Sequence, residues 1–236
     1  RRLGVDQRLS TTVSAGMLDG FDEIVCATGI EPRVPEIPGI EHPMVMRYID
    51  VLNGTSAPGR RVAIMGAGGI GFDVAQFITQ HGPSAATDPA LFAREWGIDF
   101  AHHPRGGVTG VVPVADRADR AVWLLQRKPG SPGKGLGRTT GWTHKLLLQR
   151  RGVQMLGGVE YQRIDDAGLH CTVNGEPRVL DVDTVIVCAG QVPQRALHDA
   201  LIARGLPSRL LGGANDASSL DAKRAIREAA ELAAAI

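Results

Sequence analysis

Three glycines between residues 61 and 80 have the spacing that dinucleotide-binding proteins use to hold a pyrophosphate. Gly66, Gly68 and Gly71 form a G-x-G-x-x-G pattern. In that pattern the first glycine makes a tight turn, the second lets the backbone approach the pyrophosphate, and the third lets a helix pack closely on a strand. Glycine is common in this chain, at 30 of 236 residues, so an ordinary glycine-rich loop is the alternative.

A strand must precede this turn and a helix must follow it, and the sequence predicts both. Val62 to Met65 is a short apolar run that ends at the first glycine. After the turn, apolar residues recur at i, i+4, i+7 and i+8, which is the period of one helix face: Ile70, Val74, Phe77 and Ile78. The helix N-terminus would present free amides and a positive dipole to the phosphates. The stretch therefore favours dinucleotide binding.

The end of the next strand indicates which dinucleotide is bound. A simple βαβ unit places an acidic residue about twenty positions on, where it binds the ribose 2′-hydroxyl of NAD. Asp88 lies near that distance, but we reject it because it sits in a turn-rich loop with no strand before it. The second strand is expected at 121–125, and Arg127 and Lys128 follow it. These cations would pair with the 2′-phosphate of NADPH, and a solvated basic strand end is the alternative.

Other segments complete the expected architecture. Residues 81–118 are predicted to be an insertion with a short helix near 91–96. Three strands of an antiparallel meander are expected at 161–164, 169–173 and 178–182, because alternating residues are separated there by turn residues. Near the start, short strands are expected at 5–9 and 11–15, and a helix at 48–52.

Two buried strands repeat one pattern. Residues 22–29 and 183–190 both read acid, polar, four mostly apolar positions, small residue and glycine, and both continue as Gly-x-x-Pro. This echo predicts two nucleotide-binding domains, with a cofactor crossing each strand end at Thr28, Gly29 and Gly190. A third such corner is predicted where the strand 209–211 leads through two glycines into a helix.

Composition excludes several classes of function. Net charge is +1 with both signs interspersed, so no nucleic-acid or membrane partner is indicated. Three cysteines lie far apart, which predicts no disulfide framework or metal cluster but buried thiols in a reducing, cytoplasmic compartment. His102 and His103 lack a third ligand at useful spacing, so no metal site is predicted. No residue is assigned as catalytic. Because the chain begins at Arg1 without methionine, we expect it to be part of a longer protein.

Several motifs together resemble the bacterial NADPH-dependent 2,4-dienoyl-CoA reductases over essentially the whole chain. The insertion and the Gln-Arg-Lys strand end are more specific than the glycine pattern. The segments that carry the resemblance are Val62-Ala-Ile-Met-Gly-Ala-Gly-Gly-Ile-Gly-Phe-Asp73, Glu95-Trp-Gly-Ile-Asp99, Leu124-Leu-Gln-Arg-Lys128, Gly135-Leu-Gly-Arg-Thr-Thr-Gly-Trp142 and Leu220-Asp-Ala-Lys-Arg224.

The resemblance implies an α/β fold of the pyridine nucleotide-disulfide oxidoreductase type. A Rossmann-like three-layer NAD(P)-binding domain with an antiparallel β-meander, at 57–205, would be inserted in a partial FAD-binding domain made of 1–56 and 206–236. In that family an N-terminal TIM barrel carries FMN, a 4Fe–4S cluster and the dienoyl-CoA site used in unsaturated fatty acid β-oxidation. These parts are missing here, so the chain alone is expected to be inactive toward substrate.

The same resemblance implies a role for individual residues. Gly66, Gly68, Gly69 and Gly71 would hold the NADPH pyrophosphate, and Arg127 with Lys128 its 2′-phosphate. Thr28, Gly29 and Gly213 would line FAD. Where the family usually has an acidic residue that contacts the ribityl chain, this sequence has Asn215, which can still bind a ribityl hydroxyl. A second hypothesis is a structural module that holds ADP or a dinucleotide without catalysis, as in related amine dehydrogenases.

Overall fold

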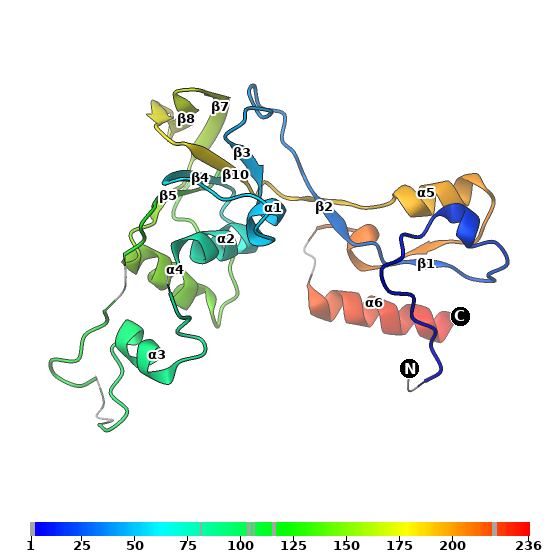
Figure 1. Ribbon diagram of the computed structural model, residues 1–236, viewed down its shortest axis with the longest axis horizontal. Coiled ribbons are helices and arrows are strands. Elements are labelled where there is room, and N and C mark those ends of the chain that lie inside the picture. Colours follow the sequence, from blue (N-terminus) through cyan, green and yellow to red (C-terminus); the bar gives the residue numbers. More distant parts are fainter. Residues whose placement is uncertain (1–2, 81, 103–104, 106, 115–116, 219–220) are drawn as a thin grey trace. The chain divides into compact units, whose positions relative to one another are not determined.

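The computed structural model describes residues 3–80, 82–102, 105, 107–114, 117–218 and 221–236, and the chain divides into two compact units. We call residues 34–190 the inner unit, and residues 1–33 with 191–236 the outer unit. Figure 1 shows the elements of both. His103, which sequence analysis considered as a metal ligand, and Leu220, in one of the family motifs, lie outside the described residues.

The inner unit is built on a parallel sheet of five strands. Its order is β3 (Val45–Arg47), β10 (Thr184–Val187), β4 (Arg61–Met65), β5 (Ala121–Leu125) and β6 (Gln154–Leu156). All four neighbouring pairs are parallel. The helices α2 (Gly69–Thr79) and α4 (Gly141–Arg150) make the crossovers from β4 to β5 and from β5 to β6, and α1 (Tyr48–Leu52) follows β3.

Two hydrophobic clusters cover the two faces of this sheet. On one face, side chains of α1, α2 and α4 pack on alternate residues of the strands, such as Ile64 and Leu124. On the other face, Met65 and Leu125 pack against the meander of β7 (Val159–Asp165), β8 (Gly168–Val173) and β9 (Glu176–Leu180). Figure 1 shows α2 and α4 on one side of the sheet and β7 and β8 on the other. The predicted three-layer α/β fold with its antiparallel meander is confirmed.

Among its described residues, the insertion after α2 contains one helix, α3 (Pro89–Trp96). Asp88 caps its N-terminus, since its carboxylate Oδ1 accepts the amides of Ala90 at 2.9 Å and Leu91 at 3.1 Å. Such a cap satisfies helix amides that have no partner within the helix. The acidic residue at NAD-like distance therefore has a structural role, in agreement with its rejection from the sequence.

The outer unit has less regular structure. β1 (Val25–Cys26) pairs in parallel with β12 (Arg209–Leu210), and β2 (Ile30–Pro32) pairs antiparallel with β11 (Gln191–Pro193). The remaining elements are the short 3-10 helices η1 (Ala15–Met17) and η2 (Gly212–Ala214) and the helices α5 (Ala196–Ala203) and α6 (Ala222–Ala235). Its small core is formed by Ile24, Cys26 and Leu201.

One expectation for this unit was wrong. Residues 5–9 and 11–15 form no strands, because residues 3–14 are exposed and have no strand to pair with. The proline-containing segment after Gly29 begins with β2, and residues 33–37 form no helix or strand. Both strands of a two-stranded ribbon are edge strands. Proline, which lacks a backbone amide, is tolerated there because an edge strand does not use every amide for pairing.

The units divide the chain differently from the predicted cofactor domains. β3 lies in the inner sheet beside β10, and α5 packs in the outer unit near η1. The boundaries between the compact units therefore follow residues 33 and 190, whereas the limits of the NADPH domain were predicted at 57 and 205. The cofactor limits stay a prediction.

Candidate dinucleotide site of the inner unit

The turn between β4 and α2 contains two glycines that no other residue can replace without strain. Gly66 has φ +117°, and a Cβ added there would lie 2.3 Å from the carbonyl oxygen of Cys188. A Cβ on Gly71 would lie 1.8 Å from the carbonyl oxygen of Gly66. The first glycine thus lets β4 and the end of β10 approach, and the third lets α2 pack on the turn.

Gly68 and Gly69 are different, because nothing lies within 4 Å of a Cβ added to either. Gly68 also has an extended backbone, with φ −84° and ψ −173°, which any residue can adopt. The protein's own packing therefore does not explain these two glycines. These glycines leave open space in front of the first turn of α2, a helix of eleven residues. A pyrophosphate would approach the helix amides through this space, so the turn fits a dinucleotide.

Arg127 and Lys128 lie at the same carboxyl edge of the sheet as the glycine turn, since Leu125 pairs with Met65. Both side chains are exposed, and neither forms a hydrogen bond or ion pair with another residue that the structure describes. The backbone that carries them is held in place. Gln126 donates its amide to Leu156 at 2.8 Å, and Lys128 accepts the amide of Gly158 at 3.0 Å. Two unpaired cations on a fixed strand end are suited to bind a phosphate.

The end of β10 borders the turn from the other side. Gly190 follows it with φ +104°. Burial raises the pKa of the Cys188 thiol to about 12, so this side chain remains a neutral thiol at physiological pH. A thiolate nucleophile is not provided at this position.

A glycine-lined corner in the outer unit

The outer unit has a cavity of about 390 Å³ at the predicted FAD corner. Two of the predicted FAD residues, Gly29 and Gly213, line it together with Ala27, Leu211, Gly212, Asp221, Ala222 and Ala225. Small residues leave room for a ligand beside the N-terminus of α6, so the corner fits part of a flavin nucleotide.

The other two predicted FAD residues do not line this cavity. The hydroxyl of Thr28 donates to the carbonyl oxygen of Gln194 at 2.5 Å and so ties the chain after β1 to the chain after β11. The Asn215 carbonyl oxygen accepts a bond from Arg195, and its amide donates to Gly212 at 3.1 Å. Both residues shape the backbone around the corner.

A second cavity beside the insertion

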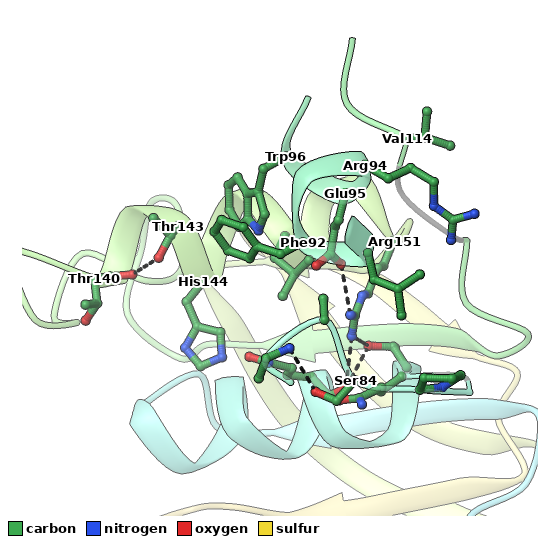
Figure 2. Close-up of a pocket in the computed structure, with 18 residues that line it drawn as sticks. Ser84, Phe92, Arg94, Glu95, Trp96, Val114, Thr140, Thr143, His144 and Arg151 are labelled. Carbon is green, nitrogen blue, oxygen red and sulfur yellow. Dashed lines mark hydrogen bonds and ion pairs between the residues drawn. The ribbon is translucent and has the colours of Figure 1, made fainter. Parts of the chain in front are cut away.

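Sequence analysis missed a cavity of about 310 Å³ between α2, α3 and α4. Figure 2 shows Phe92 and Trp96 of α3 on one side of it and Thr140, Thr143 and His144 on another. It lies at the C-terminal end of α2, where Thr79 is about 15 Å along the helix from the glycine turn. Only the folded insertion creates this cavity, and no local sequence pattern would have signalled it.

A largely buried ion pair fixes α3 in this position. Arg151 donates to Glu95 Oε1 at 3.1 Å and to the carbonyl oxygen of Gln76 at 3.3 Å. The two charged side chains are only 10% and 16% exposed. The guanidinium of Arg150 also lies 5.1 Å from the centre of the Trp96 ring.

Comparisons with known proteins

Neither a membrane span nor a metal centre appears in the described part of the chain. None of its helices is both long and apolar enough to cross a bilayer. No three histidine, cysteine or acidic side chains gather there as metal ligands would.

Residues 5–206 match the family described as pyridine nucleotide-disulphide oxidoreductase, and the chain belongs to this family. The match agrees with the parallel sheet, the meander and the glycine turn described above. The family implies binding of FAD and NAD(P)H, so the chain is an electron-transfer module of a flavoprotein oxidoreductase.

Among characterised relatives, the metal reductase of Desulforamulus reducens is 27% identical over 207 residues, 85% of this chain and 30% of the relative. Two solved structures share the fold. A 2-naphthoyl-CoA reductase complex has a TM-score of 0.75 at 19% identity, covering 100% of this chain and 30% of that chain. Histamine dehydrogenase from Rhizobium sp. 4-9 has a TM-score of 0.64 at 14% identity, covering 94% and 32%. The chain spans about a third of each of these proteins.

Proposed function

We propose that the chain is the NADPH-to-FAD electron-entry module of a longer flavoprotein that reduces 2,4-dienoyl-CoA. The observation that carries the choice of NADPH is a pair of exposed cations, Arg127 and Lys128, at the sheet edge that also bears the open glycine turn. Neither has an ion-pair partner in the part of the chain that the structure describes. A 2′-phosphate adds about two negative charges that NADH lacks, and a guanidinium can bind them through two parallel hydrogen bonds.

Each part of the chain has a distinct task in this proposal. When bound, NADPH supplies a hydride and FAD accepts it. The amides around Gly68 and Gly69 bind the pyrophosphate, and Arg127 and Lys128 orient the adenosine end. The outer unit holds part of FAD at the corner lined by Gly29 and Gly213.

The remaining chemistry belongs to a partner segment, the N-terminal TIM-barrel part of the same protein, with FMN, a 4Fe–4S cluster and the dienoyl-CoA site. The cysteines of this chain cannot hold that cluster by themselves, because a 4Fe–4S cluster is bound by four cysteine thiolates and the chain has three. The acyl-CoA substrate is supported by the motifs quoted above and by the fold shared with 2-naphthoyl-CoA reductase.

The outer unit supports the idea that further protein covers it. α6 has no buried residue although one of its faces is apolar, and its Ile226 side chain is 69% exposed. β1 and β12 form a sheet of only two strands. Such an arrangement is too small for independent stability, so we assign the remaining FAD-binding segment to this surface.

Titration of the full-length protein with NADPH and NADH tests the cofactor assignment. We expect Arg127→Ala to weaken NADPH binding at least about tenfold while NADH binding stays unchanged, because only NADPH carries the 2′-phosphate. Arg178→Ala is the matched control, since this exposed arginine lies on β9 of the same unit and has no ion pair in the described structure. Equal affinities of the wild type for both nucleotides would refute the proposed phosphate pocket.

The fold shared with histamine dehydrogenase keeps one alternative, a module that holds ADP or a dinucleotide as a structural element. Anaerobic mixing with NADPH separates the two functions. Under the main proposal NADPH bleaches the flavin absorbance of the full-length protein. If nucleotide binds and the flavin stays oxidised, the structural role is correct.

A further inference from the structure

The tyrosine at position 161 lies below the dinucleotide site, on β7 of the meander. Its hydroxyl is 3.5 Å from the carbonyl oxygen of Leu125, the last residue of β5. The same carbonyl oxygen accepts the amide of Gly66 at 3.0 Å. One carbonyl group therefore joins the meander, the glycine turn and the strand end that leads to Arg127 two residues later.

The ring and the hydroxyl of Tyr161 have different surroundings. The Tyr161 ring packs with the apolar cluster formed by the sheet and the meander. Burial raises the pKa of Tyr161 far above its ordinary value, while the charge of Arg127 and the amide of Gly66 act in the opposite direction. The phenol therefore stays a neutral hydrogen-bond donor. The two groups that lower its pKa, Arg127 and Gly66, belong to the candidate dinucleotide site, whereas Cys171 and Cys188 raise it.

We propose that Tyr161 is a positioning residue for cofactor selectivity, whose hydroxyl fixes the Leu125 carbonyl and thereby the placement of Arg127 relative to the glycine turn. This inference rests on the proposed function. Binding of the shared pyrophosphate depends on the turn alone, whereas binding of a 2′-phosphate depends on the turn and Arg127 being correctly spaced. Loss of the hydroxyl should therefore affect NADPH more than NADH.

Tyr161→Phe separates this role from simple packing, because phenylalanine retains the buried ring and lacks only the hydroxyl. We expect the NADPH affinity of the full-length protein to fall about twofold, the effect of one long and therefore weak hydrogen bond, and the preference for NADPH over NADH to fall with it. The matched control is Tyr48→Phe. Tyr48 is the other tyrosine of the chain and is buried against the helical face of the sheet. This control should leave the preference unchanged.

A double-mutant cycle with Arg127→Ala completes the test. If Tyr161 acts through Arg127, then Tyr161→Phe will not change the nucleotide preference further in the Arg127→Ala background. If Tyr161→Phe leaves the preference intact while Arg127→Ala abolishes it, the positioning role is wrong and the proposed function stands. If the wild-type protein binds NADPH and NADH equally, both the positioning role of Tyr161 and the proposed function are wrong. Thermal unfolding of each variant establishes that the comparison is made on folded protein.

Discussion

Glycine has two distinct roles at the residue scale in the turn after β4. At Gly66 the neighbouring backbone excludes a side chain, whereas at Gly68 the protein leaves the space open. The same residue type is thus required by packing at one position and by the expected ligand at the other. Substitutions by alanine can separate these requirements.

We expect Gly66→Ala to lower the free energy of unfolding by about 2 kcal/mol or more, because it combines a positive φ with a Cβ contact of 2.3 Å. Gly68→Ala should change that free energy by less than about 0.5 kcal/mol. It should nevertheless weaken nucleotide binding about tenfold, since its methyl group enters the space assigned to the pyrophosphate. Urea unfolding and nucleotide titration measure the two effects. Loss of stability in Gly68→Ala would contradict this assignment.

At the scale of elements, α3 is attached to the nucleotide-binding layer by the buried pair of Glu95 and Arg151 (Figure 2). Removing Glu95 leaves the largely buried charge of Arg151 with neutral acceptors only, the Gln76 carbonyl and the Thr79 hydroxyl. Glu95→Ala should therefore lower the free energy of unfolding by about 3 kcal/mol and expose the insertion to proteolysis. Replacing both residues by apolar ones of similar size, as in Glu95→Leu with Arg151→Met, should recover most of this loss. Equal losses in the single and double variants would disprove the charge argument.

The hairpin of β7 and β8 is sensitive to acid. Asp165 accepts bonds from Arg163, from His170 and from the amide of Ala167, and chiefly the Arg163 and His170 bonds lower its pKa to about 2. A carboxylate whose pKa is lowered by folding stabilises the folded state above its ordinary pKa near 4, and this contribution is lost as the pH falls toward 2.

Hydrogen exchange can follow this effect at a single amide. The protection of the Ala167 amide in the wild type should decrease between about pH 4 and pH 2, because its acceptor becomes protonated. Asp165→Asn cannot titrate, so its protection should not show this step. A step of the same size in both proteins would assign the acid sensitivity to another group.

Much of the inner unit could be predicted because its signals are local. β5 was expected at 121–125 and lies at Ala121–Leu125, since the apolar run there is bounded by the polar residues Arg120 and Gln126. The turn at Asn174 and Gly175 was recognisable because both residues adopt positive φ, which their types favour. The glycine turn was recognisable from the spacing of its glycines between an apolar run and a helical pattern.

Features that depend on distant partners could not be predicted. The role of Tyr161 depends on a carbonyl group 36 residues away, and in the sequence this tyrosine is only one apolar residue of an alternating strand. The cavity beside α3 depends on how the insertion folds back on α2 and α4. α5 also escaped recognition, because its helix has only a weak apolar stripe and one buried residue, Leu201.

At the scale of the whole molecule, the repeated Gly-x-x-Pro segments prove to be strands that pair with each other. Residues 30–32 form β2 and residues 191–193 form β11, with Val192 opposite Glu31. The Gln194 side chain strengthens this ribbon by donating to Glu31 Oε1 at 3.0 Å. The sequence echo was recognised, but it was interpreted as one strand end in each of two domains. Each of the two segments is the only strand neighbour that the other has among the described residues.

This pairing has a consequence for how the protein could have been assembled during evolution. Pro32 is opposite Gln191, so the Cα atoms of these two residues lie about 5 Å apart. The chain enters the inner unit shortly after Pro32 and leaves it just before Gln191. A domain whose two ends lie so close together can be inserted into a loop of a host protein without distorting the domain or the host. The 157 residues from Val34 to Gly190 therefore have the topology of a guest domain, and the ribbon marks the point of insertion in its host.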